Sequence, residues 1–335
     1  MSAGGHGPSS DAGSSQAGYA GSARYRAYEA LPLLIALGFF FAMPDYLALG
    51  ARILIFCLFA LSLDLALGFG GIVTLGHSAF LGTGAYVAGF IGAYSPIGDP
   101  LLQLIGATLA AGAMGLVTGA IILRTRGLTL IMLTLAFAAV LAELANKASG
   151  ITGGTDGLSG IQVAPLFGRF DFDLYGQTAY LYCLAILMVG WYLVRRLVQS
   201  PFGASLAGIR ENPARMRAIG VPVYRRLVLA YAMSAAIAGA AGALLTQINQ
   251  LVGLDVLGFE PSGDVLVMLI LGGVGRIYGA FLGPALFLLL QDSLAKQFPA
   301  FWYLGIGLCL LVVVWIAPNG LVGLIERGVR AWRRR

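Results

Sequence analysis

The stretch "GFGGIVTLGHSAFLGTGAYVAG", residues 68–89, holds seven glycines and one of the two histidines of the chain, and it carries no formally charged residue. Apolar sequence continues on both sides of it. Glycine is unfavourable inside a helix because it loses the most conformational freedom on folding. The stretch therefore predicts a break in an otherwise apolar helical region, with His77 at the break.

The composition around this stretch is that of a membrane protein. The chain has 335 residues, of which 59% are hydrophobic and 11% are charged, whereas a soluble domain carries about 25% charged residues. A bilayer core of about 30 Å needs roughly 20 apolar residues per helix. We therefore predict an all-α polytopic membrane protein with about ten transmembrane helices and broken or re-entrant glycine-rich segments. The predicted spans are residues 31–48, 51–68, 77–95, 101–123, 127–146, 176–194, 227–249, 263–275, 278–293 and 300–317.

The change in composition along the chain divides it into three predicted regions. Residues 1–29 are rich in glycine, serine and alanine without an apolar pattern, which predicts a disordered tail. Residues 30–325 form the transmembrane domain and include a polar loop at 200–222. Residues 326–335 form a basic tail. The apolar run after Arg26 is too long for a signal-peptide core, so we predict an uncleaved first span.

Basic residues predict the orientation. With the N-terminus inside, 17 of the 21 basic residues are cytoplasmic, in agreement with the positive-inside rule. Both termini are then cytoplasmic. We interpret the arginines of the C-terminal tail as contacts with anionic lipid headgroups rather than with nucleic acid.

Several kinds of catalytic site are missing from the sequence. Lys147 and Lys296 are the only lysines and neither follows a glycine, so the chain has no nucleotide-binding P-loop. The two histidines and three cysteines have no metal-ligand spacing, and no serine-nucleophile motif is present. We expect no catalytic site, no metal and no cofactor, and we interpret Cys57, Cys183 and Cys309 as buried small apolar residues.

Irregular backbone survives at membrane depth only where it is buried in protein or lines a wet cavity. Transporters use such breaks to expose helix termini to a polar ligand. We therefore predict that Gly70, Gly71, Thr74, His77 and Ser78 line a substrate path, with His77 as a scaffold rather than a substrate contact. For residues 82–89 the favoured alternative is close packing of helices through small residues.

Two further glycine-rich stretches join the candidates for the path. "GGVGRIYGAFLG", from Gly272, resembles the break at residue 70 and adds Gly272 and Gly273. "SGITGGTDGL", residues 149–158, opens a long external loop whose backbone N–H groups can form an anion-binding nest. An ordinary turn-rich loop remains the alternative. The candidates here are Thr152, Gly153, Gly154, Thr155 and Asp156.

The stretch "SPFGASLAGIRENPARMRAIGVP", residues 200–222, predicts two short cytoplasmic helices. Ser200 and Asn212 are N-caps followed by proline at the first helical position. Gly220 ends the second helix and Pro222 prevents its continuation. A simple connection would be shorter, so we predict a docking element; an amphipathic helix resting on headgroups is the alternative.

Five stretches in this order resemble the permease subunits of branched-chain amino acid ATP-binding-cassette importers of the LivM-like branch. They are "GFGGIVTLGHSAFLGTGAY", "RGLTLIMLTLAFA", "ITGGTDGL", "SPFGASLAGIRENPARMRAIGV" and "LGGVGRIYGAFLGPAL". The resemblance covers about residues 31–324 and implies that residues 211–220 form a loop that couples to a separate ATPase. The coupling candidates are Arg210, Glu211, Asn212, Ala214, Arg215, Arg217 and Gly220.

The resemblance also implies an assembly in the bacterial inner membrane. A LivH-like second permease subunit, two ATP-binding subunits, a periplasmic substrate-binding protein and membrane lipids would be the partners, with ATP bound by the ATPase subunits. The substrate stays open among branched-chain and similar amino acids, amides and small organic acids, because a fold does not determine its ligand. Two rival classes remain: a stand-alone secondary carrier or facilitator, which would not need the 200–222 loop, and a membrane enzyme, which would need clustered catalytic groups.

Overall fold

The structure is a computed structural model that describes residues 36–40, 46–95, 98–165, 176–297, 304–305, 307–308, 315 and 320–323. All of these residues belong to one compact unit, Pro32–Arg335. The predicted tails at 1–29 and 326–335, Cys309 and most of the predicted span at 300–317 lie outside the described residues. The first predicted span is described only in part, with helix at residues 36–40.

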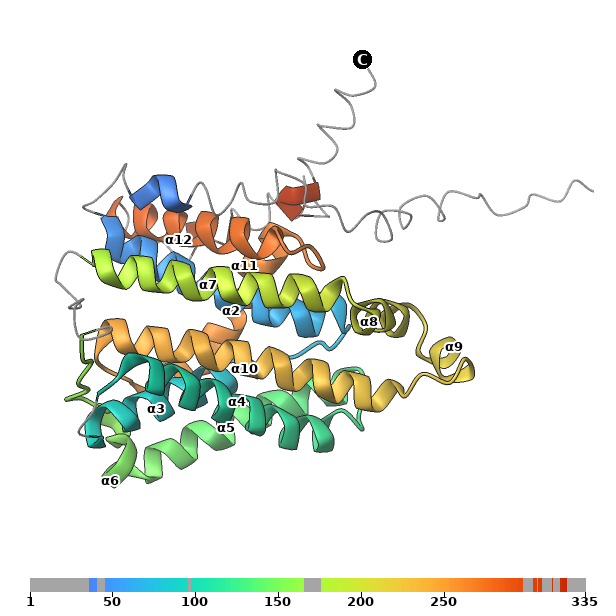
Figure 1. Cartoon of the computed structure of the whole chain (residues 1–335), viewed down its shortest axis with the longest axis horizontal. Helices are drawn as coiled ribbons and strands as arrows, with labels where there is room; N and C mark the ends of the chain where they lie inside the picture. The colour runs from blue at the N-terminus through green and yellow to red at the C-terminus, as the bar shows by residue number, and fades with distance from the viewer. Residues whose placement is uncertain are drawn as a thin grey trace, which may run out of the picture. The chain divides into compact units, whose positions relative to one another are not determined.

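The described part of the chain is helical, and its only β-type pairing is an isolated antiparallel bridge between Leu158 and Val252. Figure 1 shows the helices in chain order. They are α2 (Leu47–Leu63), η4 (Asp64–Phe69), α3 (Ser78–Tyr94), α4 (Pro100–Ile122), α5 (Leu128–Lys147), α6 (Ser149–Thr152), η5 (Gly154–Asp156), α7 (Gln177–Val198), α8 (Pro201–Glu211), α9 (Pro213–Ala218), α10 (Val223–Asn249), η6 (Leu254–Leu257), α11 (Phe259–Gly272) and α12 (Gly279–Gln297).

Five of these segments are long and apolar enough to cross a membrane: α2 with its π-helical continuation η4, α4, α5, α7 and α10. The prediction of an all-α polytopic membrane protein is confirmed. The α11 helix has 14 residues, about 21 Å at 1.5 Å per residue, which is short of a bilayer core of about 30 Å. The span predicted at residues 263–275 is thus a short helix that begins at Phe259 and ends at Gly272. The second span begins at Leu47 rather than at residue 51.

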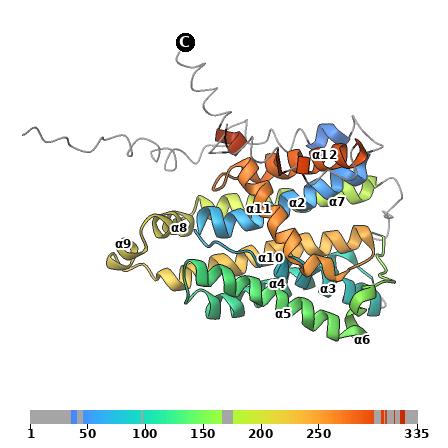
Figure 2. The same ribbon diagram turned by 180° about the vertical axis from the view of Figure 1, so that it is seen from behind.

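Helix α10 lies at the centre of the bundle. In Figures 1 and 2 it runs between α2 and α7 on one side and α3, α4 and α5 on the other. Small residues allow these close approaches: Gly84 of α3 packs on Gly239 of α10, Gly242 of α10 packs on the backbone of Leu81, and Gly115 of α4 packs on Ala235. A Cβ atom at any of the three glycines would overlap its neighbour, so the packing alternative for residues 82–89 holds at Gly84.

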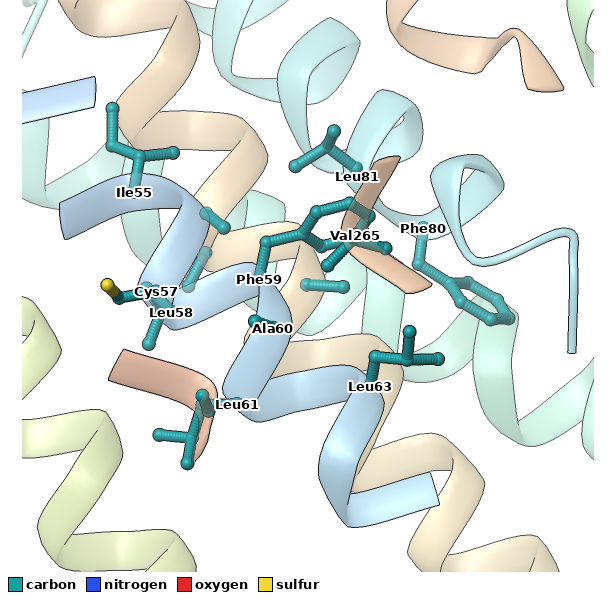
Figure 3. Packing of buried hydrophobic residues seen from close by; sticks show 14 of the residues in the cluster. Ile55, Cys57, Leu58, Phe59, Ala60, Leu61, Leu63, Phe80, Leu81 and Val265 are labelled. Carbon is teal, nitrogen blue, oxygen red and sulfur yellow. The ribbon is translucent and has the colours of Figure 1, made fainter. Parts of the chain in front are cut away.

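The main apolar core surrounds α2, which is buried on most of its sides. Figure 3 shows Phe59 of α2 directed towards Leu81 of α3 and Val265 of α11. A helix that is apolar all round is typical of the centre of a bundle. Cys57 and Cys183 are buried free thiols, as expected for small apolar residues.

The two loops that the sequence places on opposite sides of the membrane lie at opposite ends of the bundle. Helices α8 and α9, which lie within the 200–222 loop, project from one end, and α6 lies at the other. From α2 onwards the long helices run alternately between these ends. This arrangement agrees with the span order that the sequence predicts.

Candidate functional site

A cavity of about 1030 Å³ lies at the end of the bundle that carries α8 and α9. Four segments far apart in the sequence form it: the break after η4, the turn between α4 and α5, the loop from α8 to α10, and α11. Its walls are mainly apolar, and four arginines line it. The lining residues used below are Gly70, Gly71, Arg126, Arg210, Arg217, Arg225, Leu266, Ile270 and Val274.

The predicted break is present between the end of η4 at Phe69 and the start of α3 at Ser78. Three carbonyl groups of η4 remain bonded beyond its end. Gly70 N–H donates to Leu65 at 3.1 Å, Gly71 N–H to Leu67 at 3.1 Å, and Ile72 N–H to Ala66 at 2.9 Å. Gly71 has a φ of 68°, a conformation that favours glycine. The carbonyl groups of Leu65, Ala66 and Leu67 therefore stay paired where the chain leaves the helix.

The candidates at this break divide into two groups. Gly70 and Gly71 line the cavity. Thr74, His77 and Ser78 are buried in the interior and are not among its lining residues. At the second break Gly272 and Gly273 are buried, and the next residue, Val274, lines the cavity.

His77 is fully buried between two aromatic rings. The Phe59 ring stacks on it at 5.5 Å between centroids, and the Phe80 ring meets it edge-on at 5.7 Å. The Ser62 hydroxyl donates to the Phe59 carbonyl at 2.6 Å and lies 2.9 Å from His77 Nε2. Because the serine has one proton to donate, His77 Nε2 is the donor in this pair. His77 thus ties the break to α2, which supports the scaffold interpretation.

Ser78 joins the same break to α11. Its backbone N–H donates to Ser262 Oγ at 2.8 Å, and Ser262 Oγ donates to Ser78 Oγ at 2.8 Å. The Ser78 hydroxyl in turn donates to the Leu257 carbonyl at 3.4 Å. These bonds satisfy a free N–H at the start of α3.

The two glycine-rich breaks meet at a junction that the sequence analysis did not predict. The Asp64 carboxylate, fully buried in η4, accepts the Gly275 N–H at 2.6 Å. Arg210, at the end of α8, donates from Nη1 to the Gly68 carbonyl. The sequence predicted a coupling role for Arg210 at a partner surface. We call Asp64, Gly68, Arg210 and Gly275 the glycine junction.

The 200–222 loop folds as its caps predict. Ser200 Oγ accepts the N–H groups of Phe202 and Gly203 at the start of α8. Asn212 Oδ1 accepts the Arg215 N–H at 3.0 Å at the start of α9, and Gly220 follows α9 with a φ of 85°. The coupling candidates Arg210, Glu211, Asn212, Ala214, Arg215, Arg217 and Gly220 are all exposed.

The 149–158 loop lies at the other end of the bundle, away from the cavity. It forms the short helices α6 and η5, with Gly153 and Gly154 at positive φ. Thr152 Oγ donates to the Ala145 carbonyl at 2.5 Å, while Thr155 and Asp156 are exposed. The structure does not bring these five candidates together with the glycine break.

Part of the cavity lining was not predicted from the sequence. Arg126, in the turn before α5, and Ile270, in α11, face the same space as Gly71. The only local signal was the short basic turn "RTRG" between two apolar runs. Among the described residues, no group of three or more His, Cys, Asp or Glu side chains could hold a metal ion.

Comparison with known proteins places the chain in a family. Residues 46–314 match the model of the family described as "Branched-chain amino acid transport system / permease component". The chain is 29% identical to the high-affinity branched-chain amino acid transport system permease protein LivM of Escherichia coli (strain K12), over 80% of this chain and 68% of that protein. The LivM protein of Salmonella typhimurium shows the same identity and coverage.

A more distant relative is the autoinducer 2 import system permease protein LsrC of Klebsiella pneumoniae, which is 32% identical over 44% of each chain. No solved structure matches. Because these relatives are permeases, the expectation that the chain is not an enzyme is confirmed. The chain belongs to the family of permease components of branched-chain amino acid transport systems.

Proposed function

We propose that the chain is the transmembrane permease subunit of an ATP-binding-cassette importer that moves branched-chain or similar amino acids into the cell. The observation that carries this proposal is the shared lining of one cavity by the glycine break and the 200–222 loop. A helix break typical of transport sites and a loop of the kind that docks an ATPase thus meet at one place. Alternating access would be driven by separate ATPase subunits.

The chemistry of the cavity suits a small amino acid. Apolar walls such as Leu266 and Ile270 fit an aliphatic side chain, and an arginine such as Arg126 fits a carboxylate. Its volume of about 1030 Å³ is ample for one such molecule, since ligand pockets are roughly 300–1,000 Å³. We propose that it is the inner half of the substrate path. The LivM names of two relatives support branched-chain amino acids as the substrate class.

The proposed orientation puts the 200–222 loop and both termini in the cytoplasm of a bacterial cell, with the permease in the inner membrane. The exposed residues of α9, with the neighbouring Glu211 and Asn212, would dock on one of two ATP-binding subunits. A LivH-like second permease would complete the path, and a periplasmic binding protein would deliver substrate at the end that carries α6.

Uptake into proteoliposomes tests the proposal. The permease would be reconstituted with the second permease and the ATPase subunits, with the binding protein and radiolabelled leucine on the outer side. We expect uptake that requires ATP inside the vesicle. Uptake at the same rate without ATP would support the secondary-carrier alternative and contradict the proposal.

A pair of variants tests the place of the cavity in the path. Ile270→Trp would fill it, whereas Ile105→Trp would change an exposed apolar position of α4 that does not line it. We expect Ile270→Trp to abolish ATP-dependent uptake and Ile105→Trp to keep it. If Ile270→Trp keeps the same uptake as Ile105→Trp, in equal amounts of assembled complex, the cavity does not lie on the substrate path.

A further inference from the structure

We propose that Arg210 is a positioning residue that transmits movement of the 200–222 loop to both glycine-rich breaks. This inference rests on the proposed function, because it assigns the route by which an ATPase docked on α8 and α9 would act on the substrate path. It differs from the docking role that the sequence predicts for Arg210.

The contacts of the Arg210 side chain carry the inference. Its backbone belongs to the last turn of α8, and its Nη1 donates to the Gly68 carbonyl at the end of η4. Its aliphatic part crosses Gly71, where an added Cβ would lie 3.1 Å from Arg210 Cγ. The side chain therefore spans from the exposed loop to the backbone of the first break.

The second break is held at the same place. An added Cβ at Gly275 would lie 2.9 Å from Arg210 Nη1 and 3.3 Å from the Gly68 carbonyl oxygen. The Asp64 carboxylate, four residues before Gly68 on η4, binds the Gly275 N–H at 2.6 Å. The guanidinium group of Arg210 therefore contacts one break directly and lies against the other.

Glycine is required at these contacts for two separate reasons. A Cβ at Gly68 would lie 2.6 Å from the Gly275 nitrogen and would separate the two breaks. Gly71 and Gly275 have φ angles of 68° and 77°, which other residues rarely adopt. The backbone can therefore approach the arginine closely, and a displacement of α8 passes to both breaks instead of being absorbed by side chains.

Gly68 lies in the π-helical segment η4, and such turns recur at functional sites. Its bond to Arg210 is charge-assisted, which makes it roughly twice as strong as a neutral hydrogen bond. Arg210 also lines the cavity together with Gly71 and Val274. Movement of α8 would thus change the width of the cavity at the two breaks.

Three substitutions at one position separate the proposed role from packing. Arg210→Lys keeps a charged donor, Arg210→Met keeps a long apolar stem without a donor, and Arg210→Ala removes both. Arg196→Ala, at an exposed arginine near the end of α7 outside the cavity, is the matched control. Each permease would be reconstituted with the second permease, the ATPase subunits and the binding protein. Assembly, ATP hydrolysis and leucine uptake would be measured on the same vesicles.

We expect Arg210→Met and Arg210→Ala to assemble with the ATPase and hydrolyse ATP, while leucine moved per ATP falls roughly tenfold or more, as for loss of a charge-assisted bond. Arg210→Lys should recover part of the ratio, and Arg196→Ala should keep all of it. A wild-type ratio in Arg210→Met, or loss of ATPase binding instead, would overturn the role of Arg210. Absence of ATP-dependent uptake in the wild-type vesicles would instead contradict the proposed function.

Discussion

At the scale of single residues, His77 supports the break from inside the core. The ring lies between Phe59 and Phe80, and its Nε2 pairs with the Ser62 hydroxyl. A buried polar group left without its partner costs about 1–3 kcal/mol. The contacts of His77 are therefore those of a structural residue, while the cavity is lined by its neighbours Gly70 and Gly71.

We expect His77→Gln to lower the free energy of unfolding in detergent by about 1–3 kcal/mol and to leave the apparent affinity for leucine unchanged. Ser62→Ala supplies the second arm of a double-mutant cycle, and the two changes should be less than additive because they remove one bond. A His77→Gln permease of unchanged stability and altered substrate affinity would make His77 a substrate contact.

Gly71 tests the close approach of Arg210 to the first break. Gly71 and Gly160 both have positive φ angles, 68° and 76°, but only Gly71 has a side chain against it. Both Gly71→Leu and Gly160→Leu carry the same backbone strain, so the difference between them reports crowding. We expect Gly71→Leu to block ATP-dependent uptake and Gly160→Leu to retain it, measured at equal amounts of folded complex. Uptake by Gly71→Leu at the level of Gly160→Leu would show that the break does not border the path.

At the scale of elements, the sequence predicted features that depend on neighbouring residues. The caps at Ser200 and Asn212 and the turn at Gly220 were predictable because each acts within three or four positions of the chain. The break after η4 was predictable from its glycines. The bond from Asp64 to Gly275 joins residues 211 positions apart, and no periodicity or local motif reports such a contact. The same reason explains why the inward direction of Arg210 was missed.

The end of α9 provides the prediction at this scale. Gly220 N–H bonds to the Arg217 carbonyl at 3.0 Å and Val221 N–H to the Met216 carbonyl at 3.0 Å, which closes the helix. A β-branched residue at a φ of 85° would open this turn. We expect Gly220→Val to reach the membrane in normal amounts and to lose coupling of ATP hydrolysis to uptake.

Gly160→Val, with a similar φ and open space around it, is the control and should remain coupled. Normal coupling in both variants would mean that the shape of the 200–222 loop is not used by the ATPase.

At the scale of the whole molecule, the distribution of arginines and the helix order predict one orientation in the membrane. Ala214 in α9 and Thr155 in η5 are exposed at opposite ends of the bundle. Single cysteines at these positions, in a chain with Cys57, Cys183 and Cys309 replaced, can be labelled with a membrane-impermeant maleimide. We expect labelling of Thr155→Cys in intact cells, and of Ala214→Cys only after the inner membrane is opened. Labelling of Ala214→Cys in intact cells would show that the proposed orientation is wrong.

We propose that the end of the bundle that carries α8 and α9 docks a separate ATPase beside the inner half of the substrate path. A photo-crosslinking amino acid at position 214, in the assembled transporter in its native membrane, tests this docking. We predict a crosslink to the ATP-binding subunit from position 214, and none to that subunit from position 155. A crosslink to the ATP-binding subunit from position 155, or no crosslink from position 214 in a complex that hydrolyses ATP, would show that the ATPase does not dock at this end.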